Sequence, residues 1–293
     1  MIMSHTKKNS KNLPDTGPRP YSGFGQINGK HPLREAVPNG FVDYPVRTRQ
    51  GGEVFYFNFE LAKEMGLIPD NHPHKLNKSL CKAFLQTFSL EVINEYDVMH
   101  DIKTPKKDIH PNKYMATRYL QGQHPNKNGN SSGDGRSIWN GIFVNKKTKN
   151  NNAQHVTWDI SSCGTGATCL SPATAIENRF FKTGDKNVSY GGGRCDFLDG
   201  VCGAIMSDIF HRNNVITERT LGIIAFNDNT SINIRVSRNL FRPAHIFHHL
   251  KQNNHQGLKT AVDYYIDRQV TNGDWPDLPG RKKKYKYFLQ RVA

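Results

Sequence analysis

The chain has 293 residues, enough for one large or two small domains with ordinary hydrophobic cores. Its 40 lysines and arginines against 25 acids give a formal charge of +15, which favours polyanions such as ATP, nucleic acid or anionic lipid without choosing among them. Five cysteines without a C-x-x-C pair argue against a disulfide framework or a zinc knuckle, and no run reaches the roughly 18 apolar residues that cross a bilayer. We therefore expect a reduced, cytoplasmic protein without a membrane partner.

The first 40 residues are rich in Gly, Pro, Asn and Lys, and they lack the apolar stretch of a signal peptide. They predict a poorly ordered basic arm. A buried helix is expected next, after the cap candidates Asn77 and Ser79, because apolar residues recur there at near-helical spacing: Leu80, Phe84, Leu85, Phe88, Val92 and Ile93.

The middle of the chain predicts a β-hairpin followed by a long helix. Alternating residues from Ile138 to Val144 and from Val156 to Ile160 indicate its two strands, and the polar stretch Asn145–Gln154 between them is interpreted as a solvated loop. A helix is predicted from about Asp196 to His211, with one apolar face made of Phe197, Leu198, Val201, Ile205, Met206, Ile209 and Phe210.

Two further strands and three helices complete the predicted order. A buried strand is expected over Thr220–Phe226, then a turn and a strand in which Ile232, Ile234 and Val236 alternate with Asn233, Arg235 and Ser237. Helices are expected over Pro243–Leu250, Leu258–Ile266 and Lys282–Val292. This order suits an α+β lobe better than a doubly wound sheet.

Three glycine-rich motifs are candidate phosphate sites, because glycine lets backbone N–H groups approach an anion. Gly133-Asp134-Gly135-Arg136 precedes the hairpin, and Gly191-Gly192-Gly193-Arg194 precedes the long helix, whose positive dipole end adds to the attraction. The third motif, Cys163-Gly164-Thr165-Gly166-Ala167-Thr168, lacks the lysine of a Walker loop. Each motif alone is equally consistent with a plain turn.

Arg235 and Arg242 are the fourth candidate, since two converging guanidinium groups could hold a triphosphate. His245 and His249 share a helical face, but no third metal ligand is evident. The basic run from Arg281 to Lys286 has no nucleic-acid recognition motif and is interpreted as a solvated helix face, so a nucleic-acid partner is not favoured.

Taken in order, these segments resemble the selenoprotein O (SelO) family from about residue 41 to the end. Members show G-D-G-R, then K-G-A-G-x-T-P-Y-S, then D-G-R before a long helix, then R-V-x-x-x-x-x-R. The matching places here are Gly133 to Arg136, Cys163 to Thr168, Gly192 to Arg194, and Arg235-Val236 through Arg242. Thr217, Arg219 and Leu221 fall on the family's T-x-R-x-L.

The resemblance implies a protein-kinase-like fold and transfer of AMP from ATP to Ser, Thr or Tyr hydroxyls of protein substrates. It implies an N-terminal segment over 41–130, a kinase-like N-terminal lobe with the nucleotide site over 131–252, and the incomplete start of a C-terminal helical lobe over 253–293. It further implies that ATP contacts, or lies beside, eight positions: Gly133, Gly135, Arg136, Cys163, Gly192, Gly193, Arg235 and Arg242.

This sequence departs from the family at positions that carry chemistry. The family's ATP-binding lysine is Cys163 here, its partner glutamate is Gly203, and the aspartate of D-G-R is Gly192. The family's catalytic aspartate and Mg²⁺ ligands lie in an H-G-V-x-N-T-D-N segment, which none of the 293 residues matches. We therefore name no catalytic or metal residue and expect the chain to be inactive alone. A noncatalytic nucleotide- or protein-binding pseudoenzyme is the alternative.

Overall fold

The computed structural model describes residues 21–120, 132–145, 155–188 and 192–292. Arm residues 1–20, most of the hairpin loop and Gly191 lie outside them. The arm predicted over 1–40 is wrong for residues 21–40, which form a short 3-10 helix and helix α1 and bury Phe24, Ile27 and Leu33. Apolar side chains spaced among polar ones are enough to anchor a Gly- and Pro-rich segment.

The fold is α+β, built on one sheet of nine strands in which every pair is antiparallel. The strand order is β2-β8-β9-β6-β5-β4-β1-β3, and the short β7 also pairs with β9. The strands are β1 (Phe41–Thr48), β2 (Glu53–Phe57), β3 (Leu90–Val92), β4 (Ile109–Thr117), β5 (Ser137–Asn145), β6 (Val156–Cys163), β7 (Cys195–Asp196), β8 (Arg219–Ala225) and β9 (Thr230–Ser237).

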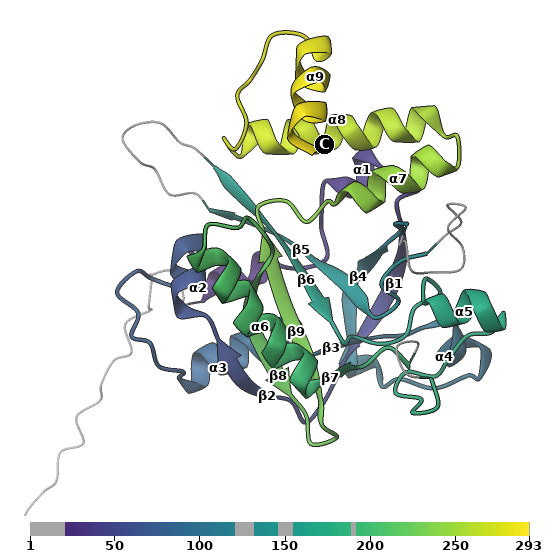
Figure 1. Ribbon diagram of the computed structural model, residues 1–293. Coiled ribbons are helices and arrows are strands. Elements are labelled where there is room, and N and C mark those ends of the chain that lie inside the picture. Colours follow the sequence, from purple (N-terminus) through teal and green to yellow (C-terminus); the bar gives the residue numbers. More distant parts are fainter. Residues whose placement is uncertain (1–20, 121–131, 146–154, 189–191, 293) are drawn as a thin grey trace, which may run out of the picture.

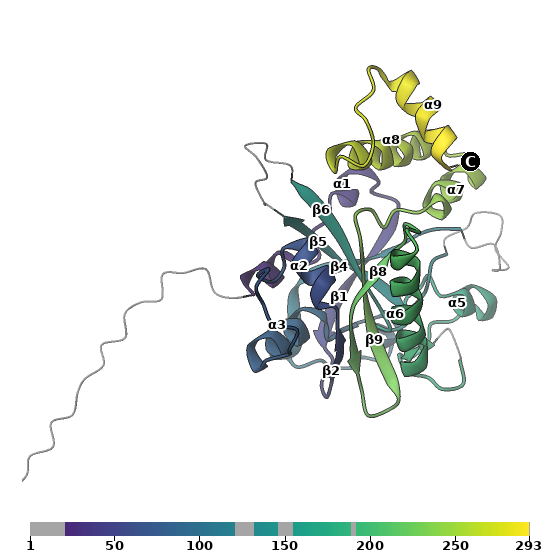
Figure 2. The ribbon, with the colours of Figure 1, turned by 60° about the vertical axis from the view of Figure 1, so that its left-hand side comes forward.

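Helices cover both faces of the sheet and one of its ends (Figures 1 and 2). Helix α6 lies across β8 and β9, whereas α7, α8 and α9 form a separate layer at the end of the sheet. The helices are α1 (Leu33–Ala36), α2 (Phe59–Met65), α3 (Lys78–Phe88), α4 (Glu95–Met99), α5 (Pro172–Glu177), α6 (Phe197–Arg212), α7 (Pro243–Lys251), α8 (His255–Thr271) and α9 (Arg281–Val292). Short 3-10 turns lie at Ser22–Gln26 and Lys106–Asp108.

The predicted hairpin, long helix and second strand pair are confirmed as β5–β6, α6 and β8–β9. The helix after Asn77 is confirmed as α3, with the Asn77 side chain accepting a hydrogen bond from Leu80 N. It ends at Phe88, and Val92 belongs to strand β3 because Leu90 to Val92 pair with β1.

The main core lies between the sheet and α3. Phe84 and Phe88 pack there against the alternating residues of β9, Ile232, Ile234 and Val236. The opposite side chains of β9 therefore face α6, and they are polar, as the alternation predicted. This polar face carries the candidate site.

Candidate functional site

The polar side chains of three neighbouring strands meet on the α6 side of the sheet. Cys163 of β6 lies opposite Ser137 of β5 and Asn233 of β9, and Ser161 of β6 lies opposite Arg235. Directly opposed residues of antiparallel strands project to the same face. The alternation of β9 therefore predicts where Arg235 points, and the same alternation along β5 and β6 could have found Ser137 and Ser161, which sequence reasoning missed.

Arg235 is held by an acidic side chain from the connection before β8. Its Nη1 donates to Glu218 Oε1 at 2.8 Å and its Nη2 to Ser137 Oγ at 3.3 Å, while its buried Nε has no hydrogen-bond partner. Burial disfavours the charge, but the Glu218 carboxylate outweighs it and raises the pKa of Arg235 above its usual value. Arg235 is thus a permanent cation whose Nε–H donor is unused.

Arg242 reaches the same place from the N-cap of α7. Its guanidinium lies 4.9 Å from the ring centre of Tyr119. Arg235, Arg242 and Gly135 line one narrow cleft, together with Asp134 and Glu218. The structure therefore brings together three residues that were predicted from separate parts of the sequence.

The cleft itself is small. Its free volume is about 20 Å³, and one water molecule needs about 10–15 Å³ measured in this way. A triphosphate does not fit this conformation of the cleft.

The three glycine motifs form one cluster of loops. Gly164 N donates to Arg136 O at 2.8 Å, and Thr168 N donates to Gly135 O at 3.0 Å. Gly166 N donates to Gly193 O at 2.9 Å, which joins the third motif to the second. Backbone hydrogen bonds thus hold the three motifs beside one another.

Close backbone packing requires glycine at four of these positions. A Cβ on Gly133 would lie 2.7 Å from Thr117 O, one on Gly192 would lie 2.6 Å from Asp185 O, and one on Gly135 or Gly193 would collide with backbone. The N–H groups of Gly133 and Gly192 donate to Leu170 O and Val188 O. These two amides are therefore engaged within the protein in this conformation, and phosphate binding by the glycine motifs stays a prediction.

Arg136 points away from the cleft, toward the start of α6. Its Nη1 lies 3.4 Å from Arg194 O and 3.6 Å from Asp199 Oδ2. Arg136 therefore ties the first glycine motif to the motif that precedes α6, and it does not line the cleft of Arg235 and Arg242.

Cys163 is buried at the end of β6, beside Asp134, whose Oδ2 lies 3.8 Å from its sulfur. A hydrogen bond from the Cys195 thiol lowers the pKa of Cys163, aided by the guanidinium groups of Arg235 and Arg136 and opposed by burial. The same contact, together with burial, raises the pKa of Cys195. The two buried thiols therefore interact, and the guanidinium groups of Arg235 and Arg136 favour the thiolate of Cys163.

Cys163 and Gly203, the positions that the resemblance matches to a lysine–glutamate pair, lie beside a neutral side chain. Asn233 lies opposite Cys163 in the sheet, and its Nδ2 is 3.0 Å from where a Cβ on Gly203 of α6 would be. The amide of Asn233 thus occupies the space between the two substituted positions.

The histidines of α7 are used for packing. His245 Nε2 lies 3.2 Å from Thr117 Oγ1, and its Nδ1 accepts from Arg242 N at 3.0 Å. Among the described residues, no three His, Cys, Asp or Glu side chains are grouped so that they could hold a metal ion.

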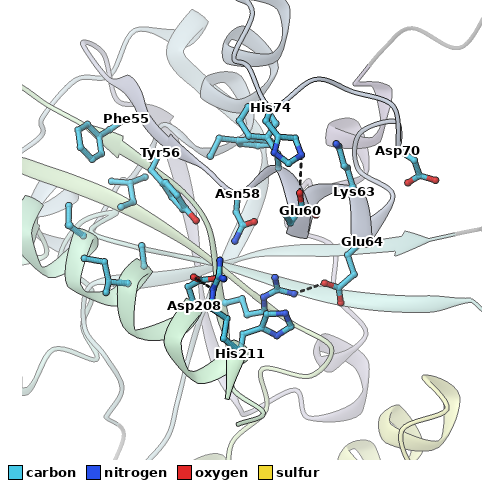
Figure 3. A pocket seen from close by; sticks show the side chains of 18 residues that line it. Phe55, Tyr56, Asn58, Glu60, Lys63, Glu64, Asp70, His74, Asp208 and His211 are labelled. Carbon is cyan, nitrogen blue, oxygen red and sulfur yellow. Dashed lines mark hydrogen bonds and ion pairs between the residues drawn. The ribbon is translucent and has the colours of Figure 1, made fainter. Parts of the chain in front are cut away.

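A much larger hollow lies elsewhere, between α6, α2 and β2 (Figure 3). It encloses about 910 Å³ and shares no lining residue with the cleft of Arg235 and Arg242. Size alone does not identify a phosphate site, and we place the candidate nucleotide site at the cleft because its cations converge there.

Comparison with known proteins adds no assignment: no protein family and no curated protein matches this chain. Within the part of the chain that the structure describes, no helix is both long and apolar enough to cross a membrane.

Proposed function

We propose that this chain is the ATP-binding portion of a SelO-like protein adenylyltransferase, with the fold of a protein-kinase-like N-terminal lobe. The order of hairpin β5–β6, helix α6 and strands β8–β9 supports this fold. The family reaction joins AMP from ATP to protein hydroxyls, and this chain would supply the phosphate-binding half.

The convergence of Arg235 and Arg242 at one cleft carries the proposal. A planar guanidinium donates two parallel hydrogen bonds to phosphate oxygens, and such charge-assisted bonds are stronger than neutral ones. Stabilising the charge on the phosphates is the main demand of this class of reaction. The Mg²⁺ that accompanies ATP would be carried by the phosphates, since the chain has no match to the family's metal ligands.

Binding requires a local rearrangement, because the cleft is too small and Glu218 already holds Arg235. A phosphate oxygen and the Glu218 carboxylate would compete for the same guanidinium. The affinity for ATP is therefore set partly by how readily Glu218 releases Arg235.

Calorimetric titration with ATP and magnesium tests the proposal. The double variant Arg235→Ala, Arg242→Ala removes two charge-assisted contacts, so it should lose about 3 kcal/mol or more, roughly a 100-fold weaker Kd. Glu218→Gln should bind ATP more tightly than the wild type, because it frees Arg235.

Matched controls distinguish a specific effect of this cleft on ATP affinity from a general effect of the protein's net charge. Arg179→Ala, Arg291→Ala removes the same charge from exposed surface, and Glu64→Gln frees Arg219 outside the cleft. Both should leave ATP affinity within about twofold. Wild-type binding that the Arg235, Arg242 double variant retains would refute the site.

The substituted lysine–glutamate positions favour a second candidate, a noncatalytic nucleotide-binding pseudoenzyme. Cys163 and Gly203 cannot form the ion pair that positions phosphates in kinase-like lobes. Transfer of labelled AMP to a mixture of Ser-, Thr- and Tyr-containing proteins discriminates the two. ATP binding without transfer, even when a separate chain supplies an N-T-D-N segment, would favour the pseudoenzyme.

A further inference from the structure

Strand β9 brings two buried cysteines, Cys163 and Cys195, side by side. Cys163 is the last residue of β6 and Cys195 the first of β7, and both strands pair with β9 on the edge that β8 leaves open. Cys163 lies opposite Asn233, and Cys195 lies opposite Ser231. Opposed residues share a face of the sheet, as do residues two apart in one strand. Both thiols therefore project toward α6.

The spacing of the two cysteines suits a disulfide. Strand β7 continues the row of β6 along β9, so Cys195 occupies the place two residues beyond Cys163. At about 3.3 Å per residue, their Cα atoms are about 6.6 Å apart, and natural disulfides join Cα atoms about 4.4–6.8 Å apart. The Cys195 thiol already donates a hydrogen bond to the Cys163 sulfur. The bond therefore needs little movement of either strand.

The cleft of Arg235 and Arg242 lies beside this pair. Asp134 and Ser161 line the cleft, and Asp134 Oδ2 is 3.8 Å from the Cys163 sulfur. The free volume of about 20 Å³ excludes a triphosphate but leaves room for a molecule as small as hydrogen peroxide. Nearby guanidinium groups favour the reactive thiolate form of Cys163. A small oxidant in the cleft would therefore meet Cys163.

We propose that Cys163 and Cys195 are an oxidation site that forms a reversible disulfide when the protein meets a peroxide. The Cys163 thiolate attacks one oxygen of hydrogen peroxide, the O–O bond breaks, and the hydroxide that leaves takes up a proton to become water. Cys163 is then a sulfenic acid. The Cys195 sulfur attacks the Cys163 sulfur, the S–S bond forms, the S–O bond breaks, and a second water leaves with the Cys195 proton.

The reaction removes two electrons from the thiol pair and reduces one peroxide to two waters. A dithiol reductant reverses it by thiol–disulfide exchange. The disulfide would tie the end of β6 to the residue before Asp196, the N-cap of α6. Because neither sulfur is required to hold a phosphate, this inference stands or falls separately from the proposed function.

A triple variant isolates the pair for the test. Cys81→Ser, Cys169→Ser, Cys202→Ser in the full chain leaves Cys163 and Cys195 as the only thiols. The folded variant is treated with hydrogen peroxide, its remaining thiols are alkylated, and it is digested without reduction. Both thiols should become resistant to alkylation, and dithiothreitol should restore both. Circular dichroism before and after oxidation should show the same fold.

Mass spectrometry of the digest identifies the bond. Trypsin cuts after Arg179 and Arg194, so Cys163 and Cys195 fall in separate peptides that only a disulfide joins. The joined peptides should appear after oxidation and disappear after reduction. In the wild type, the same treatment should remove two of the five thiols and leave three that are alkylated.

Single substitutions in the triple variant serve as controls. Cys163→Ser and Cys195→Ser should each abolish the joined peptides, and the Cys195→Ser protein should accumulate a Cys163 sulfenic acid that dimedone traps. Oxidation that leaves the two peptides separate would overturn the proposal. Joined peptides that arise only from covalent dimers on a non-reducing gel, or only after unfolding in urea, would overturn it equally.

Discussion

His31 Nε2 and Asp159 Oδ1 lie 3.1 Å apart, both fully buried, although 128 residues separate them in the sequence. The same carboxylate accepts from Arg268 of α8 and, through Oδ2, from Leu240 N at 2.9 Å. Asp159 thus fastens the N-terminal segment, β6 and the C-terminal helices at one point. Burial alone would raise its pKa, but Arg268, His31 and Leu240 N lower it below the usual value.

Asp159→Asn should destabilise the protein by about 3–5 kcal/mol, because it leaves the Arg268 guanidinium buried without its counter-charge. Urea unfolding followed by circular dichroism measures this loss. Asp267→Asn is the control, since Asp267 pairs with Arg281 at the surface, where such pairs contribute about 0–1 kcal/mol. A difference below about 1 kcal/mol between the two variants would refute the role of Asp159.

The stability that Asp159 contributes should decrease as the pH falls. A carboxyl whose folded pKa lies below its unfolded value stabilises fully above the unfolded pKa, near 3.9, and loses that contribution as pH falls toward the folded pKa. The wild type should therefore lose stability below about pH 4 more steeply than Asp159→Asn. Unfolding free energies from pH 5 to pH 3 test this, and parallel curves would contradict it.

The histidines of α7 should affect the free energy of unfolding at a higher pH than Asp159 does. Burial, with the charges of His249 and Arg118, lowers the pKa of His248 to about 4, so His248 folds in its neutral form. The stability that the neutral His248 side chain gives the folded state is complete above the unfolded pKa of about 6.5, and it is lost as pH falls from 6.5 to 4. His248→Gln should flatten the decline of stability in that window, as unfolding free energies from urea denaturation across it would show.

The fold was predictable where local pattern decides it. Alternation located β5, β6 and β9, a short apolar run located β8, and the Asn77 cap located α3. Residues 21–40 were missed because their burial depends on partners far along the chain, as His31 shows. Asp159 was missed for the same reason, because its partners lie far away in the sequence and its neighbours Trp158 and Ile160 indicate only a polar residue within a strand.

The periodicity of the sequence could not predict which face of α6 is buried. Its large apolar residues form one face and its small residues another. Hydrophobicity alone favours burial of the face with the large residues. The structure buries Gly200 and Ala204 instead, because only small side chains allow the close approach to Ser231. Similarly, the sequence predicted that Arg235 and Arg242 converge, while the competing Glu218 became visible only in three dimensions.

Helix α6 offers a direct test of that orientation. Gly200→Leu should destabilise the protein by about 1–3 kcal/mol through overpacking against Ser231 of β9, whereas Ile205→Ala should change stability by less than about 0.5 kcal/mol. Chemical denaturation measures both. The reverse ranking would mean that the large residues face the sheet.

The packing of the glycine loops can be separated from backbone strain. Gly193 and Gly51 have nearly equal positive φ angles, 75° and 78°, but a Cβ on Gly193 would collide with the Ala167 backbone, and one on Gly51 would meet nothing within 4 Å. Gly51→Ala should cost about 1–2 kcal/mol from left-handed backbone strain alone. Gly193→Ala should cost at least about 2 kcal/mol more by urea unfolding, because Gly166 N donates to Gly193 O and the two loops must separate. If the two substitutions cost the same, the contact between these loops contributes nothing, and the cluster that positions Gly135 beside Arg235 is held by its other hydrogen bonds.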